Sequence, residues 1–346
     1  NGLLLDYGAG STLGSTSVVA LTTSTYATGW MNGDIKGAFL SDTDDTDLVG
    51  SEFSDDFSGY SDQAAMQSAG YSFTNTAFDA ALNTVVFSGS AGANMTLSSA
   101  TLTAAGIAAG DAYEVTVVVT GIVAGGISVQ DNLVNMGSFY TDGTHIFRGT
   151  RAGNFRLATA SSLEGEIQSI TFRKLDHDRS VNNNGLIVNG TITRTAVASG
   201  ADLVAYSGFS AANYLEQPYS SALDFGTGDF SVMGWATIAG TSDWILDRKS
   251  GGDVTTAGFE IYQMNTTGLL IVRTLDGTAS TPTDLGNLPA TGWGFFTAVR
   301  KDGVTYGYMN GELYASGADT RDVTNAAAVL VVGGQADNTS HWQAAG

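Results

Sequence analysis

Four residues near the end of the sequence have the side chains that a sugar-binding surface needs: Asp337, Asn338, His341 and Trp342. An indole ring can stack on the apolar face of a pyranose, while carboxylate, amide and imidazole groups hydrogen-bond its hydroxyls. The cluster therefore predicts a glycan platform. The alternative is an ordinary loop in which a following strand partly buries Trp342.

A second cluster of the same kind lies in the first half of the chain. Phe139 and Tyr140 are followed by Asp142 and His145. Two adjacent rings close to a carboxylate and an imidazole offer the same stacking and hydrogen-bonding chemistry. Phe139 and Tyr140 are the predicted glycan contacts here, and the alternative is a hairpin tip with half-buried aromatic rings.

Catalytic chemistry has little support in the sequence. The chain has no cysteine, only three widely spaced histidines and no Gly-x-Ser-x-Gly motif, which disfavours nucleophilic hydrolases. Glu164 and Glu166 alternate onto one face of a strand, but a solvent-facing pair does the same. We therefore predict that the protein is not an enzyme.

The composition is typical of a strand-and-turn protein, with 45 glycines, 3 prolines and 14% charged residues. A net charge of −20 repels phosphate backbones and anionic lipids, so nucleic acid is not an expected partner. No apolar run reaches about 18 residues, so no membrane insertion is expected. The chain begins without Met and ends without a strand or cap, and we expect it to be part of a longer product.

Short alternating segments separated by Gly and Asp turns predict an all-β fold of antiparallel strands, arranged as a sandwich or a barrel. The resemblances described below imply two antiparallel β-sandwiches of jelly-roll type in series. We expect a short N-terminal arm at 1–51, the first sandwich at 52–176, an exposed polar connector at 177–200 and the second sandwich at 201–346. The second sandwich is expected to be truncated at its C-terminal end.

Short motifs predict individual turns, loops and core residues. Asp302-Gly303 and Asn310-Gly311 each fit a type I′ turn between antiparallel strands. Residues 100–110 contain two glycines and are expected to form a loop with a turn rather than a helix. The acidic run 42–47 lacks the glycine of an EF-hand turn and is interpreted as a solvated turn rather than a calcium loop. Three tryptophans are expected to pack in the core: Trp235, Trp244 and Trp293.

A tryptophan-led strand at 293–300, a charged hairpin and an aromatic strand ending in Asn310-Gly311 follow one another in the second half. With the strand 214–216 and the segment 223–232, this order resembles the laminin-G-like, concanavalin-A-like jelly-roll superfamily. The resemblance implies sugar binding at rim loops, often around calcium, or on a concave sheet face. It implies possible calcium ligands at the rim: Asp247, Asp276 and Asp302. The Glu-x-Asp-x-x-Glu strand of the related glucanases is absent.

Residues 52–176, which end in the strand 165–175, resemble the carbohydrate-binding-module-type jelly rolls of phage tail proteins. The segment 29–44 and the residues 179–182 resemble pieces that precede such modules. The order of arm, binding-type module, connector and laminin-G-like domain is similar to that of a bacteriophage tail fibre or appendage protein.

This second resemblance implies an extracellular virion surface protein that attaches the particle to a host cell-surface glycan. The N-terminal arm would dock onto other virion proteins, and the chain would form a homo-oligomer, a trimer by analogy with fibres. Two alternatives stay open. One is a purely structural virion module for decoration or assembly, without glycan binding, and the other is a secreted lectin-like bacterial adhesin.

Overall fold

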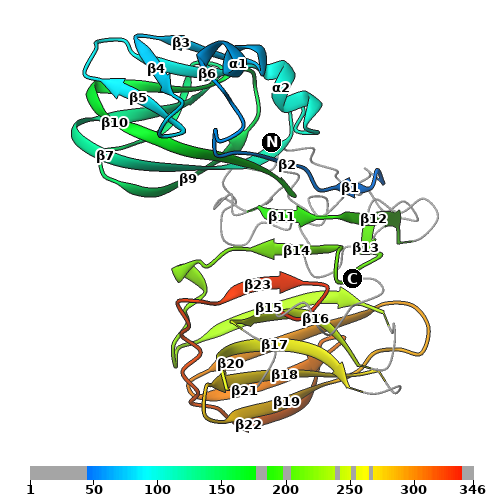
Figure 1. Ribbon diagram of the computed structural model, residues 1–346. Helices are drawn as coiled ribbons and strands as arrows, with labels where there is room; N and C mark the ends of the chain where they lie inside the picture. The colour runs from blue at the N-terminus through cyan, green and yellow to red at the C-terminus, as the bar shows by residue number, and fades with distance from the viewer. Residues whose placement is uncertain are drawn as a thin grey trace, which may run out of the picture.

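The computed structural model of the protein describes residues 45–176, 185–197, 204–237, 242–250, 255–264 and 268–336. Antiparallel strands dominate these ranges and form two β-sandwiches, one above the other in Figure 1. The predicted all-β fold class is confirmed. Within the described ranges, no helix has the length and apolar character needed to span a membrane.

The first sandwich is built around two long strands, β7 and β10, which pair antiparallel from Ala112 opposite Leu175 to Asp131 opposite Phe155. Its elements, in chain order, are β2 (Glu52–Asp55), α1 (Gln63–Ser68), β3 (Tyr71–Thr74), β4 (Thr76–Asp79), β5 (Thr84–Ser88), β6 (Asn94–Leu97), α2 (Ser99–Ala104), β7 (Ala112–Asp131), β8 (Val134–Phe139), β9 (Gly143–Thr150) and β10 (Phe155–Asp176).

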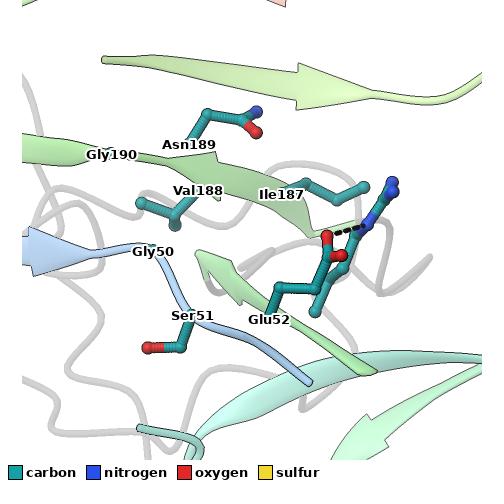
Figure 2. Close-up of a pocket in the computed structure, with 8 residues that line it drawn as sticks. Gly50, Ser51, Glu52, Ile187, Val188, Asn189 and Gly190 are labelled. Carbon is teal, nitrogen blue, oxygen red and sulfur yellow. Dashed lines mark hydrogen bonds and ion pairs between the residues drawn. The ribbon is translucent and has the colours of Figure 1, made fainter. Parts of the chain in front are cut away.

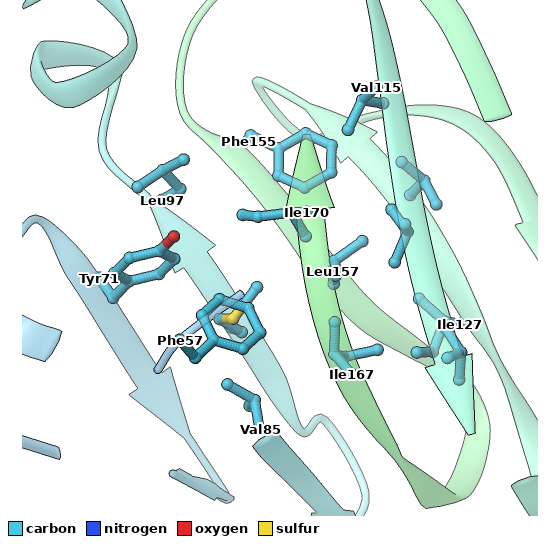
Figure 3. Close-up of a cluster of buried hydrophobic side chains, with 14 of the residues drawn as sticks. Phe57, Tyr71, Val85, Leu97, Val115, Ile127, Phe155, Leu157, Ile167 and Ile170 are labelled. Carbon is cyan, nitrogen blue, oxygen red and sulfur yellow. The ribbon is translucent and has the colours of Figure 1, made fainter. Parts of the chain in front are cut away.

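The core of this sandwich comes from strand alternation and from a β-bulge. Val115, Val117 and Val119 of β7 alternate inward and are fully buried. In β10 a register shift after Ile167 inserts one extra residue, so Ile167 and Ile170 both face the core although they are three positions apart. Figure 3 shows several of these side chains gathered in one cluster.

The prediction of a loop over residues 100–110 is wrong for its first part, which is the helix α2. The hydroxyl of Ser98 caps the helix by accepting a hydrogen bond from the N–H of Thr101 at 3.2 Å. Leu102 is 1% exposed and packs in the core. Gly106, with φ of +86°, lies after the helix and therefore does not weaken it.

Between the sandwiches lie β1 (Leu48–Val49), β11 (Leu186–Asn189), β12 (Thr191–Ala196), β13 (Val204–Ser207) and β14 (Tyr214–Gln217). The predicted exposed connector therefore contains two strands over 186–196. Val188 and Ile192 are buried against Leu215 and Leu48, and this apolar burial makes the segment part of the body of the molecule. Of the predicted arm, residues 1–44 lie outside the described ranges, and β1 pairs with β12.

A continuous ladder of backbone pairing joins the two sandwiches. β10 pairs with β11 at Leu175 and Ile187, and β11 pairs with β14 at Ile187 and Glu216. β14 then pairs with β23 (Val329–Val332), a strand of the second sandwich. Figure 1 shows β11 and β14 bridging the gap between the two domains. The joint is thus made of hydrogen-bonded strands.

The second sandwich has two sheets packed face to face. Its other elements are the short 3-10 helix η2 (Ser221–Leu223), β15 (Phe230–Ala236), β16 (Ser242–Lys249), β17 (Ala257–Met264), β18 (Leu269–Asp276), β19 (Ser280–Asn287), β20 (Gly294–Lys301), β21 (Val304–Met309) and β22 (Glu312–Ala318). The front sheet has the order β15-β20-β21-β22, and the back sheet has the order β19-β18-β17-β16-β23-β14. Ile261 and Val272 of the back sheet meet Phe296 and Ala298 of the front sheet in the core.

The predicted meander from Phe295 to Tyr314 is confirmed as β20, β21 and β22. Asp302 and Gly303 have φ of 51° and 73°, and Asn310 and Gly311 have φ of 53° and 86°. Positive φ at both central residues defines type I′ turns, as the dipeptides predicted.

Candidate functional site

The predicted platform at the end of the chain, formed by Asp337, Asn338, His341 and Trp342, lies outside the described residues. The structure therefore places neither these side chains nor their surroundings.

The cluster in the first sandwich is only partly exposed. Phe139 is 5% exposed and stacks on His145, with ring centroids 4.1 Å apart and an interplanar angle of 6°. Tyr140 is 59% exposed, and its ring lies against Gly126, where an added Cβ would come within 2.3 Å of the ring. Asp142 accepts two backbone N–H bonds from β7. The structure therefore leaves Tyr140 as the one exposed ring of the predicted pair.

The three predicted calcium ligands do not come together. Asp247 is fully buried, 3.7 Å from Lys249 Nζ, and Asp276 forms an ion pair with Arg321 at 2.6 Å. Asp302 occupies the turn between β20 and β21. In the described part of the chain, no group of three or more His, Cys, Asp or Glu side chains could hold a metal ion.

The three tryptophans predicted for the core have different positions. Trp235 is 55% exposed, so its assignment to the core is wrong: in β15 the alternate residues Phe230 and Ala236 face inward, and Trp235 faces outward. Trp244 and Trp293 are half-buried. Trp244 lies on the outward side of the back sheet, opposite Tyr262.

Strand register gathers a polar and aromatic group on the outward side of the back sheet. Asp247 lies opposite Glu260, and Glu260 lies opposite Arg273 on the next strand. Directly opposed residues of antiparallel strands share a face, and alternate residues of one strand do the same. We call this set the Glu260 face: Trp244, Asp247, Lys249, Glu260, Tyr262 and Arg273.

Glu260 is the centre of this face. One oxygen of its carboxylate accepts hydrogen bonds from Lys249 Nζ at 2.7 Å and Trp244 Nε1 at 3.0 Å, and the other pairs with the Arg273 guanidinium. Glu260 and Lys249 have no exposed side-chain surface, whereas Arg273 retains 21%. Charges buried so deeply persist only when they are paired, and here two cations and an indole N–H surround one carboxylate.

Two aromatic rings and the Arg273 cation lie at the outer side of this network. The rings of Trp244 and Tyr262 are 5.6 Å apart at 23°, and Arg273 Cζ lies 5.2 Å from the centre of the Tyr262 ring. Burial raises the pKa of the Tyr262 hydroxyl, while Arg273 acts in the opposite direction. The phenol therefore stays protonated at neutral pH and remains a hydrogen-bond donor.

This arrangement suits binding better than acid–base catalysis. Asp247 and Glu260 are paired carboxylates on neighbouring strands, as in a glycosidase, but both are fully buried. Glu260 is bound to Lys249, and the backbone N–H of Ala336 donates to Asp247 at 2.9 Å. In this arrangement both carboxylates are occupied by contacts within the protein.

Sequence reasoning missed most of the Glu260 face. The available signal was the alternation in β17, where Glu260 and Tyr262 interrupt the apolar residues Phe259 and Ile261. A charged residue in a strand with no exposed neighbours on either side indicates a buried ion pair. Its partners were not evident because Lys249 and Arg273 belong to other strands.

The front sheet carries a different outward surface. Trp235 lies opposite Phe295, and Met233 lies in one row with Thr297, Tyr308 and Leu313. We call this set the apolar face: Met233, Trp235, Phe295, Tyr306, Tyr308 and Leu313. Met233, Trp235 and Leu313 are each more than half exposed.

A small pocket of about 180 Å³ lies at the joint between the sandwiches (Figure 2). Glu52 and Arg173 form an ion pair at 2.9 Å on its wall, and Ile187 and Val188 of β11 line the other side. Ligand pockets usually have about 300–1,000 Å³, so this one is too small for a sugar chain. Gly50 passes so close to the carbonyl of Val188 that an added Cβ would be 2.2 Å from its oxygen, so the two segments are in tight backbone contact at this pocket.

Comparison with known protein families found a match in the second sandwich. Residues 209–345 match the model of a laminin G family in the concanavalin A-like lectin/glucanases superfamily. The match supports a laminin-G-like, concanavalin A-like fold for the second sandwich. Among solved structures, the LG4-5 domains of the mouse laminin alpha1 chain are similar at 12% identity and a TM-score of 0.31, over 68% of this chain and 80% of that chain. No curated protein sequence matches this chain significantly.

Proposed function

We propose that this chain is a non-catalytic glycan-binding protein of a virus surface, part of a tail fibre or appendage that attaches the particle to a host cell. The observation that carries the glycan proposal is the Glu260 face. It combines two neighbouring aromatic rings with an arginine and a phenol on one outward surface of a lectin-type sandwich.

The chemistry of this face fits a sugar. The Trp244 and Tyr262 rings offer apolar surface to the C–H side of a pyranose, and the Arg273 guanidinium and the Tyr262 hydroxyl offer donors to its oxygens. The Glu260 carboxylate fixes Trp244 and Arg273 from below. Because these contacts hold the side chains in place before a ligand arrives, binding costs less side-chain entropy.

The location on a virion rests on the order of arm, binding-type module and laminin-G-like domain in the sequence. In this proposal the arm docks onto other virion proteins, and the outward faces meet the host glycan. Each site binds weakly, and many copies on one particle raise the effective concentration enough for firm attachment.

The test is binding of the purified chain to surface polysaccharides of candidate host bacteria. We expect saturable binding that Tyr262→Ala weakens by about tenfold, because about 1.4 kcal/mol of stacking and hydrogen bonding is lost. The matched control is Leu82→Ala, which removes an exposed apolar side chain from the first sandwich, outside both faces, and should leave binding unchanged. Thermal melts establish that both variants are folded.

Two results would contradict the proposal. Equal loss in both variants would show that the Glu260 face is not the site. No binding by the folded wild-type chain to any host polysaccharide would favour the structural alternative, a decoration or assembly module. That alternative is supported by the apolar face, whose residues are suited to contact with another protein surface.

A further inference from the structure

The apolar face is nearly free of charge, although the chain as a whole is strongly acidic. Lys301 is the one charged residue at the outward positions of β15, β20, β21 and β22. The single carboxylate of these strands, Glu312, lies opposite the inward-facing Met309 and not on the apolar face. No carboxylate therefore lies at the outward positions of these four strands.

This charge pattern makes a second copy of the chain a compatible partner for the apolar face. The chain has 34 acidic and 14 basic residues, so two copies repel each other over most of their surfaces. A carboxylate-free sheet face is a surface on which two copies can approach without placing carboxylates against each other. A flat face with Trp235, Met233 and Leu313 exposed can also pack on its own copy as two sheets pack in a sandwich.

We propose that two copies of this chain pair face to face through the apolar face. The contact is isologous, which means that the same residues are used on both copies around a two-fold axis. It is independent of glycan binding, because the Glu260 face belongs to the other sheet and remains open.

The size of the face sets the strength of the contact. Four strands about 4.8 Å apart and about seven residues long at about 3.3 Å each cover roughly 400 Å². A standard protein interface buries about 800 Å² on each partner. Pairing through this face is therefore weak and concentration-dependent.

Sedimentation velocity over a range of protein concentrations tests the proposal. We expect the wild-type chain to shift from monomer to dimer as concentration rises, and Trp235→Glu to stay monomeric because it places a carboxylate in the contact. The matched control is Leu82→Glu, which changes a residue of similar exposure, 58% against 55%, in the first sandwich and should dimerise like the wild type. A wild type that stays monomeric, or a Trp235→Glu variant that still dimerises, would overturn the proposal.

A cross-linking experiment identifies the surface without disrupting it. The chain has no cysteine, so Thr297→Cys on the central strand β20 introduces a unique thiol on the apolar face. We expect a short bismaleimide to join two copies of this variant, and not two copies of Thr144→Cys, an exposed residue of β9. Equal cross-linking of both variants, or of neither, would contradict the face-to-face pairing.

Discussion

The two outward faces of the second sandwich each carry a tryptophan, yet the two rings have different surroundings. Trp244 on the back sheet donates its indole N–H to Glu260 and stacks on Tyr262, within a network of buried charges. Trp235 on the front sheet opposes Phe295 on a surface without carboxylates. A ring held among fixed polar groups is suited to a hydroxylated ligand, and a ring among apolar side chains is suited to a protein surface.

The two faces also differ in how their side chains are held in place. The Glu260 face is fixed from below by buried ion pairs, so its side chains are committed to one arrangement. On the apolar face the side chains are positioned by strand pairing and by the contact between the Trp235 and Phe295 rings, whose centroids are 5.2 Å apart. Mutations of the buried ion pairs beneath the Glu260 face should therefore affect folding, and mutations of the apolar face should affect association.

The largest effect is expected from Glu260→Gln. The change leaves Lys249 and Arg273 without their carboxylate in a buried setting, which costs about 3–5 kcal/mol of the free energy of unfolding. Denaturant unfolding measures this loss. The control is Glu312→Gln on the exposed edge strand β22, which should stay within about 0.5 kcal/mol of the wild type. Similar losses in both variants would contradict the central role of Glu260.

A smaller loss is expected from Trp244→Phe. The variant keeps an aromatic ring but removes the N–H that Glu260 accepts, so we expect about 1 kcal/mol less stability. Trp235→Phe on the apolar face has no such bond among its described contacts and should change stability by less than about 0.5 kcal/mol. Comparison of the two denaturation midpoints checks this. Equal midpoints would mean that the indole bond contributes nothing.

Glu216 lies in the same cross-strand row as the residues of the Glu260 face. It lies opposite Val331, and Val331 lies opposite Asp247. Burial raises the pKa of Glu216, with Arg173 acting in the opposite direction and Glu114 in the same direction. A carboxyl with a raised pKa binds a proton better in the folded state. Its charged form therefore lowers stability above the raised pKa, and this cost disappears as pH falls.

Glu216→Gln should accordingly raise the melting temperature at neutral pH. The difference from the wild type should vanish below about pH 4, where the carboxyl is protonated in both states. Thermal melts across this pH range test the sign. A variant less stable than the wild type at neutral pH would show that attraction to Arg173 outweighs burial.

The smallest effect is expected from removal of calcium. Asp247 and Asp276 are committed to Lys249 and Arg321, so a chelator should leave both the melting temperature and glycan binding by the Glu260 face unchanged. Calorimetry with and without a chelator measures this. A drop in melting temperature that added calcium restores would contradict the prediction.

Much of the architecture could be predicted from short-range patterns. The two Gly-containing dipeptides at residues 302–303 and 310–311 require positive φ, and they located the meander correctly. The helix α2 was missed because its signal was weak: a six-residue element is stabilised mainly by its Ser98 cap and by burial of Leu102. The strands of the predicted connector were missed because the polar residues around them obscured a short apolar run.

The all-β class, the two type I′ turns and the resemblance of the second half to laminin-G-like domains depend on neighbouring residues and their order, so they could be predicted from the sequence. Which tryptophan faces solvent and which carboxylate is neutralised depends on contacts between strands that are far apart in the sequence. Glu260 meets Lys249 and Arg273 only through strand pairing, and one bulge in β16 shifts the register after Trp244. A shift of one residue reverses the face of every following side chain, so the composition of each face depends on the folded sheet.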